Sequence, residues 1–233
     1  MGIKDLNKFI NLNVPNAIQN WDLSKFKGKK VAIDTSIFLY KYLYKNQYYI
    51  EGFFQQIYRL INNGIIPIYV FDGTPPVEKN YVLKSRKQKR KNLDNKKNML
   101  KLKYLDKINN SDIELNSILS EIKKIDKKNI KVTSDHIHKL KQLFDLMGIK
   151  YVHPNCEADT YCSALYQNNV VDMCMSDDMD LLTGGCNKLI RNFNISSNIV
   201  TFYNLDIILK ELNINKDQWL DFCILCGCDY TRS

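Results

Sequence analysis

The sequence predicts an α/β fold in which helices cover both faces of a central, mostly parallel sheet. Short runs of apolar and β-branched residues alternate along most of the chain with longer segments of helical periodicity. This alternation is typical of parallel strands joined by crossover helices. Several of the runs end in an acidic residue, and in folds of this class ligands bind beyond the carboxyl ends of the strands.

The expected elements follow in a regular order. Residues 31–34 and 65–73 read as strands, and residues 36–62 between them read as helix with a break near residues 45–47. Further strands are expected at residues 148–152, 170–176, 188–193 and 199–203. Further helices are expected at residues 135–147, 157–167 and 205–226, the last with a break near residues 213–215.

Residues 79–130 interrupt this order, because they are polar, charged and free of Gly and Pro. Their large apolar residues form only a thin stripe, so the segment does not belong in a core. We expect a protruding helical excursion, with disorder around residues 107–111. The chain is thus expected to be a single domain of residues 1–233 that carries a helical insertion at residues 79–131.

The positive charge of the chain is concentrated in the same segment. The net charge is +9, yet residues 79–107 alone hold twelve basic side chains against two acidic ones. Such a concentration is typical of a nucleic-acid contact, although a solvated helix face or a localisation signal is the alternative. The candidate contacts in this segment are Lys79, Lys84, Arg86, Lys87 and Arg90.

Composition excludes two classes of protein. No apolar run reaches the roughly 18 residues that a membrane span needs, and the N-terminus lacks the apolar segment of a secretory signal. The seven cysteines form no regular framework. We therefore expect reduced thiols, an intracellular location and no contact with a membrane.

Seven carboxylates at strand ends and helix starts point to metal-dependent chemistry. They are Asp34, Asp72, Glu157, Asp159, Asp178, Asp180 and Asp229. Buried together they would repel one another strongly unless cations joined them. Oxygen ligands suit Mg²⁺ or Mn²⁺, and clusters of such ions catalyse phosphoryl transfer.

Zinc is the alternative metal, because Cys223, Cys226 and Cys228 superficially resemble half of a zinc site. No second half is present in the sequence, and the three histidines lack ligand spacing relative to these cysteines. We therefore interpret the cysteines as structural thiols at the end of an apolar helix.

Six motifs, in order along the chain, carry a resemblance to a known family. They are MGIKDLNKFI, VAIDTSIFLY, YVFDGTPP, HPNCEADTYCSAL, SDDMDLLTGG and DFCILCGCDY. They resemble successive N-region and I-region blocks of the flap endonuclease (XPG) family of structure-specific 5′ nucleases. The resemblance implies a PIN-like 5′ nuclease fold with a basic helical arch.

The resemblance also implies roles for individual residues. Four acids, Asp34, Asp72, Glu157 and Asp159, would bind a first Mg²⁺, and three, Asp178, Asp180 and Asp229, would bind a second. Asp34 and Asp180 would thus be essential to catalysis. Lys79 and Arg86 would face the scissile phosphate and stabilise its developing charge. Tyr40 would stack on a base beside the cut, and Arg191 would contact a phosphate.

Three departures from the family pattern accompany the resemblance. The segment after Tyr40 is short, the insertion at residues 79–131 is longer than usual, and its second half differs from the family. The C-terminal duplex-binding helix–turn–helix element and the sliding-clamp-binding peptide of the family are not visible in the sequence. We expect a looser grip on duplex DNA as a result.

The expected function is divalent-metal-dependent hydrolysis of branched or flapped DNA by a monomer with two Mg²⁺ ions, for which Mn²⁺ can substitute. Its substrate would be DNA with a 5′ flap or a free 5′ end. The alternatives are a 5′→3′ exonuclease, a PIN-like ribonuclease acting on RNA, and a non-enzymatic nucleic-acid-binding scaffold. The expected location is the nucleus or another site of DNA replication, or a cytoplasmic factory if the chain is viral.

Overall fold

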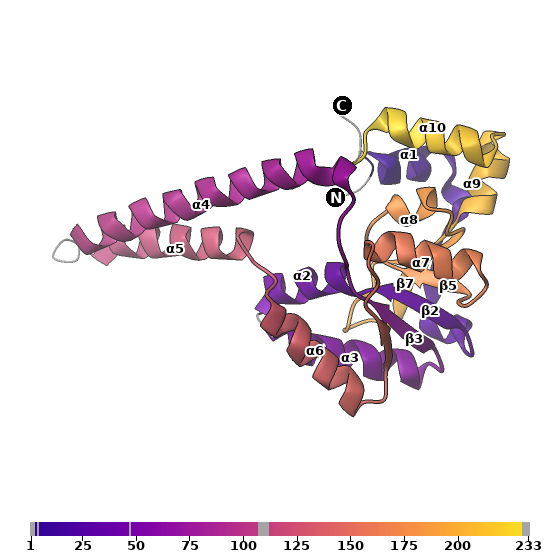
Figure 1. Cartoon of the computed structure of the whole chain (residues 1–233), viewed down its shortest axis with the longest axis horizontal. Coiled ribbons are helices and arrows are strands. Elements are labelled where there is room, and N and C mark those ends of the chain that lie inside the picture. Colours follow the sequence, from indigo (N-terminus) through magenta and orange to yellow (C-terminus); the bar gives the residue numbers. More distant parts are fainter. Residues whose placement is uncertain (1–2, 4, 47, 107–111, 230–233) are drawn as a thin grey trace.

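The computed structural model describes residues 3, 5–46, 48–106 and 112–229. Within these residues seven strands form one sheet, in the order β1-β7-β6-β5-β2-β3-β4 (Figure 1). The strands are β1 (Ile18–Asp22), β2 (Lys30–Asp34), β3 (Ile66–Val70), β4 (Lys150–Val152), β5 (Met173–Met175), β6 (Lys188–Arg191) and β7 (Ile199–Asn204). The α-helices are α1 (Leu6–Asn13), α2 (Thr35–Asn46), α3 (Tyr49–Asn62), α4 (Asn80–Asp106), α5 (Asp112–Lys128), α6 (Ser134–Leu146), α7 (Ala158–Gln167), α8 (Asp180–Thr183), α9 (Leu205–Leu212) and α10 (Lys216–Cys226).

The predicted fold class is confirmed, because the centre of the sheet is parallel and helices lie on both of its faces (Figure 1). Strands β2 to β6 pair in parallel, whereas β7 is antiparallel to both β6 and β1. Strand β1 has no counterpart among the predicted strands. Its residues Gln19, Asn20 and Asp22 are polar, and the strand lies at the edge of the sheet, where no continuous apolar run is needed.

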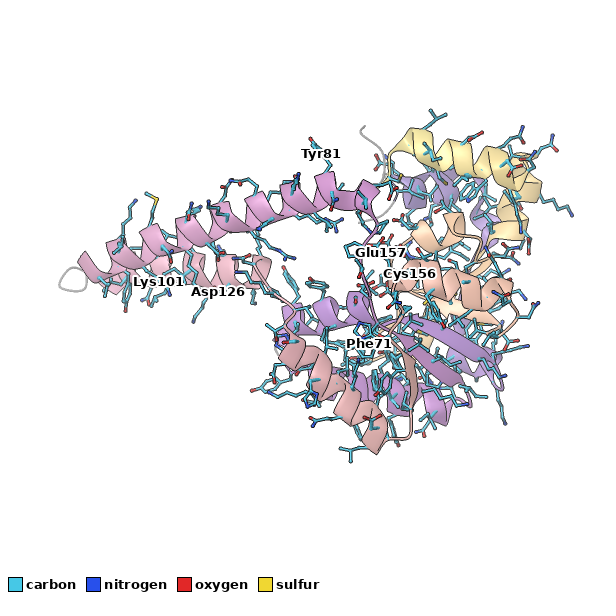
Figure 2. All side chains as sticks on the ribbon, in the orientation of Figure 1. Phe71, Tyr81, Lys101, Asp126, Cys156 and Glu157 are labelled. Atoms are coloured by element: carbon cyan, nitrogen blue, oxygen red, sulfur yellow. The ribbon has the colours of Figure 1, made fainter. Side chains whose placement is uncertain are left out.

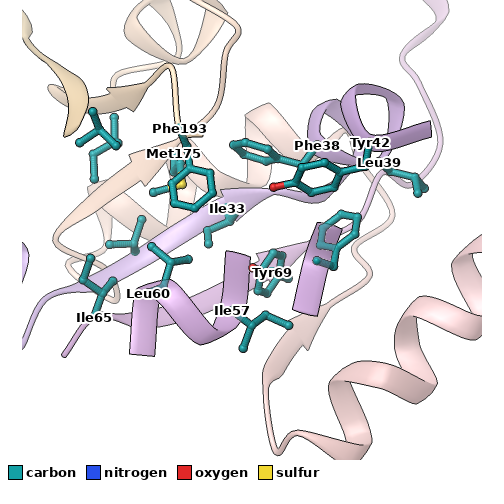
Figure 3. Packing of buried hydrophobic residues seen from close by; sticks show 14 of the residues in the cluster. Ile33, Phe38, Leu39, Tyr42, Ile57, Leu60, Ile65, Tyr69, Met175 and Phe193 are labelled. Atoms are coloured by element: carbon teal, nitrogen blue, oxygen red, sulfur yellow. The ribbon is translucent and has the colours of Figure 1, made fainter. Parts of the chain in front are cut away.

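Two apolar clusters, one on each face of the sheet, fix the positions of the helices. Alternation along β2 places Val31 and Ile33 in one cluster and Ala32 in the other. The first cluster joins the sheet to α2, α3 and α6, and Figure 3 shows Ile33 and Tyr69 within it. The second joins the sheet to α1 and α7 to α10, where Trp219 is buried. The carboxyl ends of the central strands are therefore held rigidly from both sides.

Helices α4 and α5 leave this core side by side, and we call residues 79–131 the arch (Figure 1). The two helices are joined by exposed ion pairs, among them Lys96 with Glu121 at 2.6 Å and Lys97 with Asp126. The predicted helical excursion is confirmed, and the disorder predicted at residues 107–111 lies outside the described residues. Although α4 is 27 residues long, none of the described helices is both long and apolar enough to cross a membrane.

The aromatic packing under α6 yields a first prediction. Phe144 is fully buried and stacks on Tyr69, with ring centroids 4.5 Å apart. We expect Phe144→Ala to lower the free energy of unfolding by about 3–5 kcal/mol, because it opens a cavity in the core. The matched control is Leu146→Ala on the same helix, where the side chain is 87% exposed. Urea unfolding of the two variants should differ by most of that amount, and equal losses would contradict this description of the core.

Candidate active site

Three of the candidate carboxylates lie at the carboxyl ends of neighbouring strands. Strand β2 lies between β5 and β3 and pairs in parallel with both. Asp34 is the last residue of β2, Asp72 follows β3, and Asp178 follows β5. Because parallel strands end on the same edge of the sheet, the chain brings these acids together from segments far apart in sequence.

The other four candidates lie at helix ends on the same side of the sheet. Glu157 is the N-cap residue of α7, and Asp159 lies in the first turn of that helix. Asp180 is the first residue of α8, and Asp229 follows α10. The partial positive charge at a helix N-terminus favours the ionised form of Glu157, Asp159 and Asp180, which lie at such ends.

A cavity of ≈ 770 Å³ collects most of these acids at the foot of the arch. The predicted carboxylates that line it are Asp34, Asp72, Glu157, Asp159, Asp178 and Asp229. Asp180 lines an adjoining cavity of ≈ 510 Å³, which shares Asp159 with the first. We call the part of these two adjoining cavities that the seven acids line the carboxylate cleft. The seven acids therefore lie in one neighbourhood.

Burial and mutual repulsion both act on these acids. Burial raises the pKa of Asp34 to about 7, and the charge of Asp72 adds to this effect. Burial also raises the pKa of Asp180 to about 7, together with the charges of three neighbouring carboxylates. The pKa of Asp159 is raised as well, mainly by burial. The acids are thus held close enough to disfavour one another's ionisation.

Hydrogen bonds hold several of the carboxylates in place. Asp34 accepts bonds from the backbone N–H of Ser36 at 3.1 Å and from the Ser176 hydroxyl at 3.1 Å. Asp72 accepts a bond from the backbone N–H of Ala158 at 2.9 Å, which ties the end of β3 to the start of α7. By contrast, Oδ1 of Asp180 is buried and accepts no hydrogen bond from the described part of the chain.

Two cations from the start of the arch enter the carboxylate cleft. The Lys79 ammonium lies 2.7 Å from Oε1 of Glu157 and 3.7 Å from Oδ2 of Asp229, and an Arg86 Nη lies 2.6 Å from the same Asp229 oxygen. Burial lowers the pKa of Lys79, but the bond to Glu157 and the nearby carboxylates outweigh it and raise the pKa overall. Figure 2 labels Glu157 where the arch leaves the core.

The donor set of the carboxylate cleft fits a hard divalent cation. Its acids offer oxygen ligands alone, and the unbonded Oδ1 of Asp180 is an acceptor that a cation would satisfy. Among the described residues, however, no three His, Cys, Asp or Glu side chains are already arranged around one point. Lys79 and Arg86 hold Glu157 and Asp229 instead, so these side chains would have to shift when a cation binds.

All the predicted nucleic-acid contacts except Arg191 line one or both of two cavities. Tyr40, Lys79, Arg86 and Arg90 line the ≈ 770 Å³ cavity beside the acids. A further cavity, of ≈ 920 Å³, extends under the first turns of α4 and is lined by Lys79, Lys84, Arg86, Lys87 and Arg90. Arg191 lines neither of these two cavities. Its guanidinium donates to the Asp177 carbonyl at 2.7 Å and lies over the Tyr203 ring, and the phosphate contact of Arg191 stays a prediction.

Sequence reasoning missed three side chains that support the cleft. Ser176 links Asp34 to the backbone N–H of Asp178, and Asp177 binds Lys41 at 2.7 Å. His153 bonds to the Asp72 carbonyl at 2.9 Å. The run Ser176-Asp177-Asp178 at a strand end is the sequence signal that contains two of them.

The three C-terminal cysteines carry free thiols, of which Cys223 is buried and Cys226 and Cys228 are half-buried. Burial raises the pKa of Cys223 to about 12, so the thiol stays protonated near neutral pH. This burial agrees with the interpretation of the cysteines as structural thiols at the end of an apolar helix.

Comparison with known proteins places this geometry in a family. The chain matches the model of the XPG N-terminal domain over residues 1–93 and that of the XPG I-region over residues 148–229. It is 36% identical to flap endonuclease 1 of Aedes aegypti, covering 100% of this chain and 62% of the relative. Flap endonuclease 1 of Enterocytozoon bieneusi is 35% identical, with 100% and 66% covered. The chain thus spans less than two thirds of these relatives.

Solved structures agree with the sequence matches. The catalytic core of Rad2 in complex with DNA substrate superposes with a TM-score of 0.73 at 28% identity, covering 100% of this chain and 64% of that one. Flap endonuclease-1 from Methanococcus jannaschii superposes with a TM-score of 0.64 at 26% identity, with 92% and 69% covered. With two successive family regions matched over most of its length, and relatives aligned over the whole chain, the chain belongs to the flap endonuclease (XPG) family.

Proposed function

We propose that this chain is a divalent-metal-dependent nuclease that hydrolyses phosphodiesters of flapped or branched DNA near a 5′ end. The observation that carries the proposal is the carboxylate cleft at the foot of a basic arch. Membership of the flap endonuclease (XPG) family supports it, as does the likeness to a catalytic core of Rad2 in complex with DNA substrate. Replication and repair of DNA, where such ends arise, would be its setting.

The acids would hold two Mg²⁺ ions, or Mn²⁺ in their place. Ions bound there would activate a water and stabilise the leaving oxygen of the phosphodiester. One ion would lie among Asp34, Asp72, Glu157 and Asp159, and the other among Asp178, Asp180 and Asp229. Ser176 and the N–H groups of Ser36 and Ala158 would keep the first set oriented, because they already bond to two of its members.

The two cations of the arch would act on the phosphate. Lys79 and Arg86 reach the carboxylates now, and a phosphate bound between acids and arch would offer them a second anionic partner. Their donors would then bind its non-bridging oxygens and stabilise the charge that develops there. Lys84, Lys87 and Arg90 continue the positive surface along α4, where they would guide the strand that leads away from the cut.

We also propose that the sheet, its helices and the arch work as one nuclease domain, with residues 79–131 as the insertion that selects the substrate. The start of the arch touches the carboxylate cleft directly, and both apolar clusters hold the strands that carry the acids.

The activity itself is the first prediction of this proposal. A 5′-end-labelled flap incubated with the chain and Mg²⁺ should yield labelled fragments released near the junction, and EDTA should abolish them. A blunt duplex and an RNA strand of the same sequence should be cut more slowly. Release of single nucleotides from the 5′ end would identify an exonuclease, preference for the RNA strand would identify a ribonuclease, and binding without products would identify a scaffold.

Substitutions in the carboxylate cleft should separate its two kinds of residue. We expect Asp180→Asn to lower the rate of flap cleavage by more than about 100-fold, since a metal ligand is lost. Lys79→Ala should lower it by about 100- to 1000-fold, the usual effect of removing one donor to a developing anion. Lys210→Ala on the exposed surface of α9 is the matched control and should cleave normally. Single-turnover rates would measure all three, and near-normal turnover of Asp180→Asn would contradict the two-metal assignment.

The raised pKa of Asp34 predicts how stability depends on pH without divalent cations. Between pH 8 and 5 the folded chain takes up a proton at Asp34, whose pKa is about 7, whereas the unfolded chain does so only near 3.8. Unfolding should therefore become harder as the pH falls, by on the order of 2–4 kcal/mol from this group. Asp34→Asn should be more stable than the parent chain at pH 8 and should lose this part of the pH dependence.

Thermal unfolding in EDTA at the two pH values would measure both effects. Asp217→Asn, at the exposed start of α10, is the control and should keep the parent pH dependence. An Asp34→Asn chain that is less stable than the parent at pH 8 would contradict this prediction. It would show that the hydrogen bonds to the Asp34 carboxylate stabilise the fold by more than its burial and repulsion destabilise it.

A further inference from the structure

The ≈ 770 Å³ cavity extends well beyond the acids, along α2 toward the end of α5. Its lining continues from Tyr40 to Tyr44 and Lys45 on α2, and to Lys127 and Lys128 on α5. A smaller cavity of ≈ 330 Å³ continues it further and is lined by Leu43, Tyr44, Lys45, Lys123, Asp126, Lys127 and Ile130. We call the lining that the two cavities share, Tyr44, Lys45, Lys127 and Ile130, together with Lys128, the α2–α5 groove. The proposed function makes no use of it.

Two aromatic rings lie one helical turn apart along this groove. Tyr40 and Tyr44 are four residues apart on α2, so they share one face of the helix, and both line the larger cavity. Tyr44 is 56% exposed, which leaves its ring open to a ligand. Bases of single-stranded nucleic acids stack on exposed aromatic rings of this kind when basic side chains lie beside them.

The charge of the groove is positive. Lys45, Lys127 and Lys128 line it, and Lys123 lines the smaller cavity beyond it. None of the ion pairs among the described residues includes these four lysines. The carboxylate that lines the smaller cavity, Asp126, is already paired with Lys97 of α4. Among the described residues these lysines therefore have no ion-pair partner, and they would attract a polyanion.

We propose that Tyr44, with Lys45, Lys127 and Lys128, forms a second stacking subsite for single-stranded DNA, one base beyond Tyr40. A base stacks on the Tyr44 ring, and the lysines on either side bind the flanking phosphates. The proposal rests on the proposed function, since it extends the strand that the carboxylate cleft would cut. It gives Tyr44 a role in substrate positioning, with no part in the chemical step.

Equilibrium binding tests this subsite without cleavage. A short fluorescein-labelled single strand would be titrated with the chain in EDTA, and its anisotropy would be measured. We expect Tyr44→Ala to raise Kd about 5- to 50-fold, the range that loss of one base–aromatic stacking produces. Tyr44→Phe keeps the ring and should bind like the parent chain. The matched control is Tyr58→Ala, because Tyr58 is 55% exposed on α3 and lines neither cavity of the groove.

Two further measurements separate stacking from charge. A strand carrying 2-aminopurine should lose fluorescence on binding to the parent chain at one position, and Tyr44→Ala should restore that fluorescence. The pair Lys45→Ala and Lys127→Ala should flatten the slope of log Kd against log salt concentration by about 1.4, for two lost phosphate contacts. An exposed pair elsewhere, Lys25→Ala and Lys210→Ala, should leave the slope unchanged.

The outcomes distinguish the subsite from the proposed function. If the parent chain cuts the flap while Tyr44→Ala and Tyr58→Ala bind equally well, the subsite is wrong and the nuclease stands. If the parent chain cuts nothing yet Tyr44→Ala binds more weakly than Tyr58→Ala, the subsite stands and the nuclease is wrong. Displacement of the parent strand by an acidic peptide, with equal affinity for Tyr44→Ala, would overturn the proposal in favour of a protein partner.

Discussion

The repulsion between carboxylates at the ends of three adjacent parallel strands is the constraint on which this molecule depends. Because β2 pairs in parallel with β3 and β5, the acids that follow these strands all lie at the same edge of the sheet. Burial, as at Asp34, removes the water that would screen their charges. Positive charge must therefore come from elsewhere. Within the chain it comes from Lys79 and Arg86 at the start of the arch. These side chains contact Glu157 and Asp229, two neighbouring acids of the carboxylate cleft.

The apolar clusters on the two faces of the sheet keep this unfavourable arrangement from relaxing. The first cluster packs α2, α3 and α6 against the sheet, and this packing keeps the strands that precede Asp34 and Asp72 together. In the second, Phe222 lies between Phe9 and Trp219, with ring centroids 4.7 and 5.9 Å away. That contact anchors α10, and with it the position of Asp229. Core packing thus supplies the stabilisation that the site itself does not.

Much of the fold could be predicted from the sequence, because the central strands are runs of apolar and β-branched residues. The run at residues 65–73, for example, is short, apolar and bounded by Gly and Pro, a pattern typical of a buried strand. Strand β1 was missed because an edge strand needs no apolar run, and α8 because four residues show no period. The acids could be named from their positions at strand and helix ends together with the family resemblance.

The supporting contacts could not be predicted, because they join residues that no local pattern relates. The Ser176 hydroxyl that bonds to Asp34 and the His153 ring that bonds to the Asp72 carbonyl depend on how strands and loops meet in space. Arg191 is a residue whose role only the family resemblance implied. Its guanidinium donates to the Asp177 carbonyl and lies over the Tyr203 ring, and its phosphate contact stays a prediction.

The length of α4 places the far end of the arch well away from the carboxylate cleft. At 1.5 Å per residue its 27 residues extend about 40 Å, and ion pairs join it to α5 along the way. A rotation of α4 by about 10° at its base would carry its far end through about 7 Å, by this same geometry. If a change in the partners of Lys79 and Arg86 turned α4, the displacement would therefore be largest where no acid of the cleft reaches.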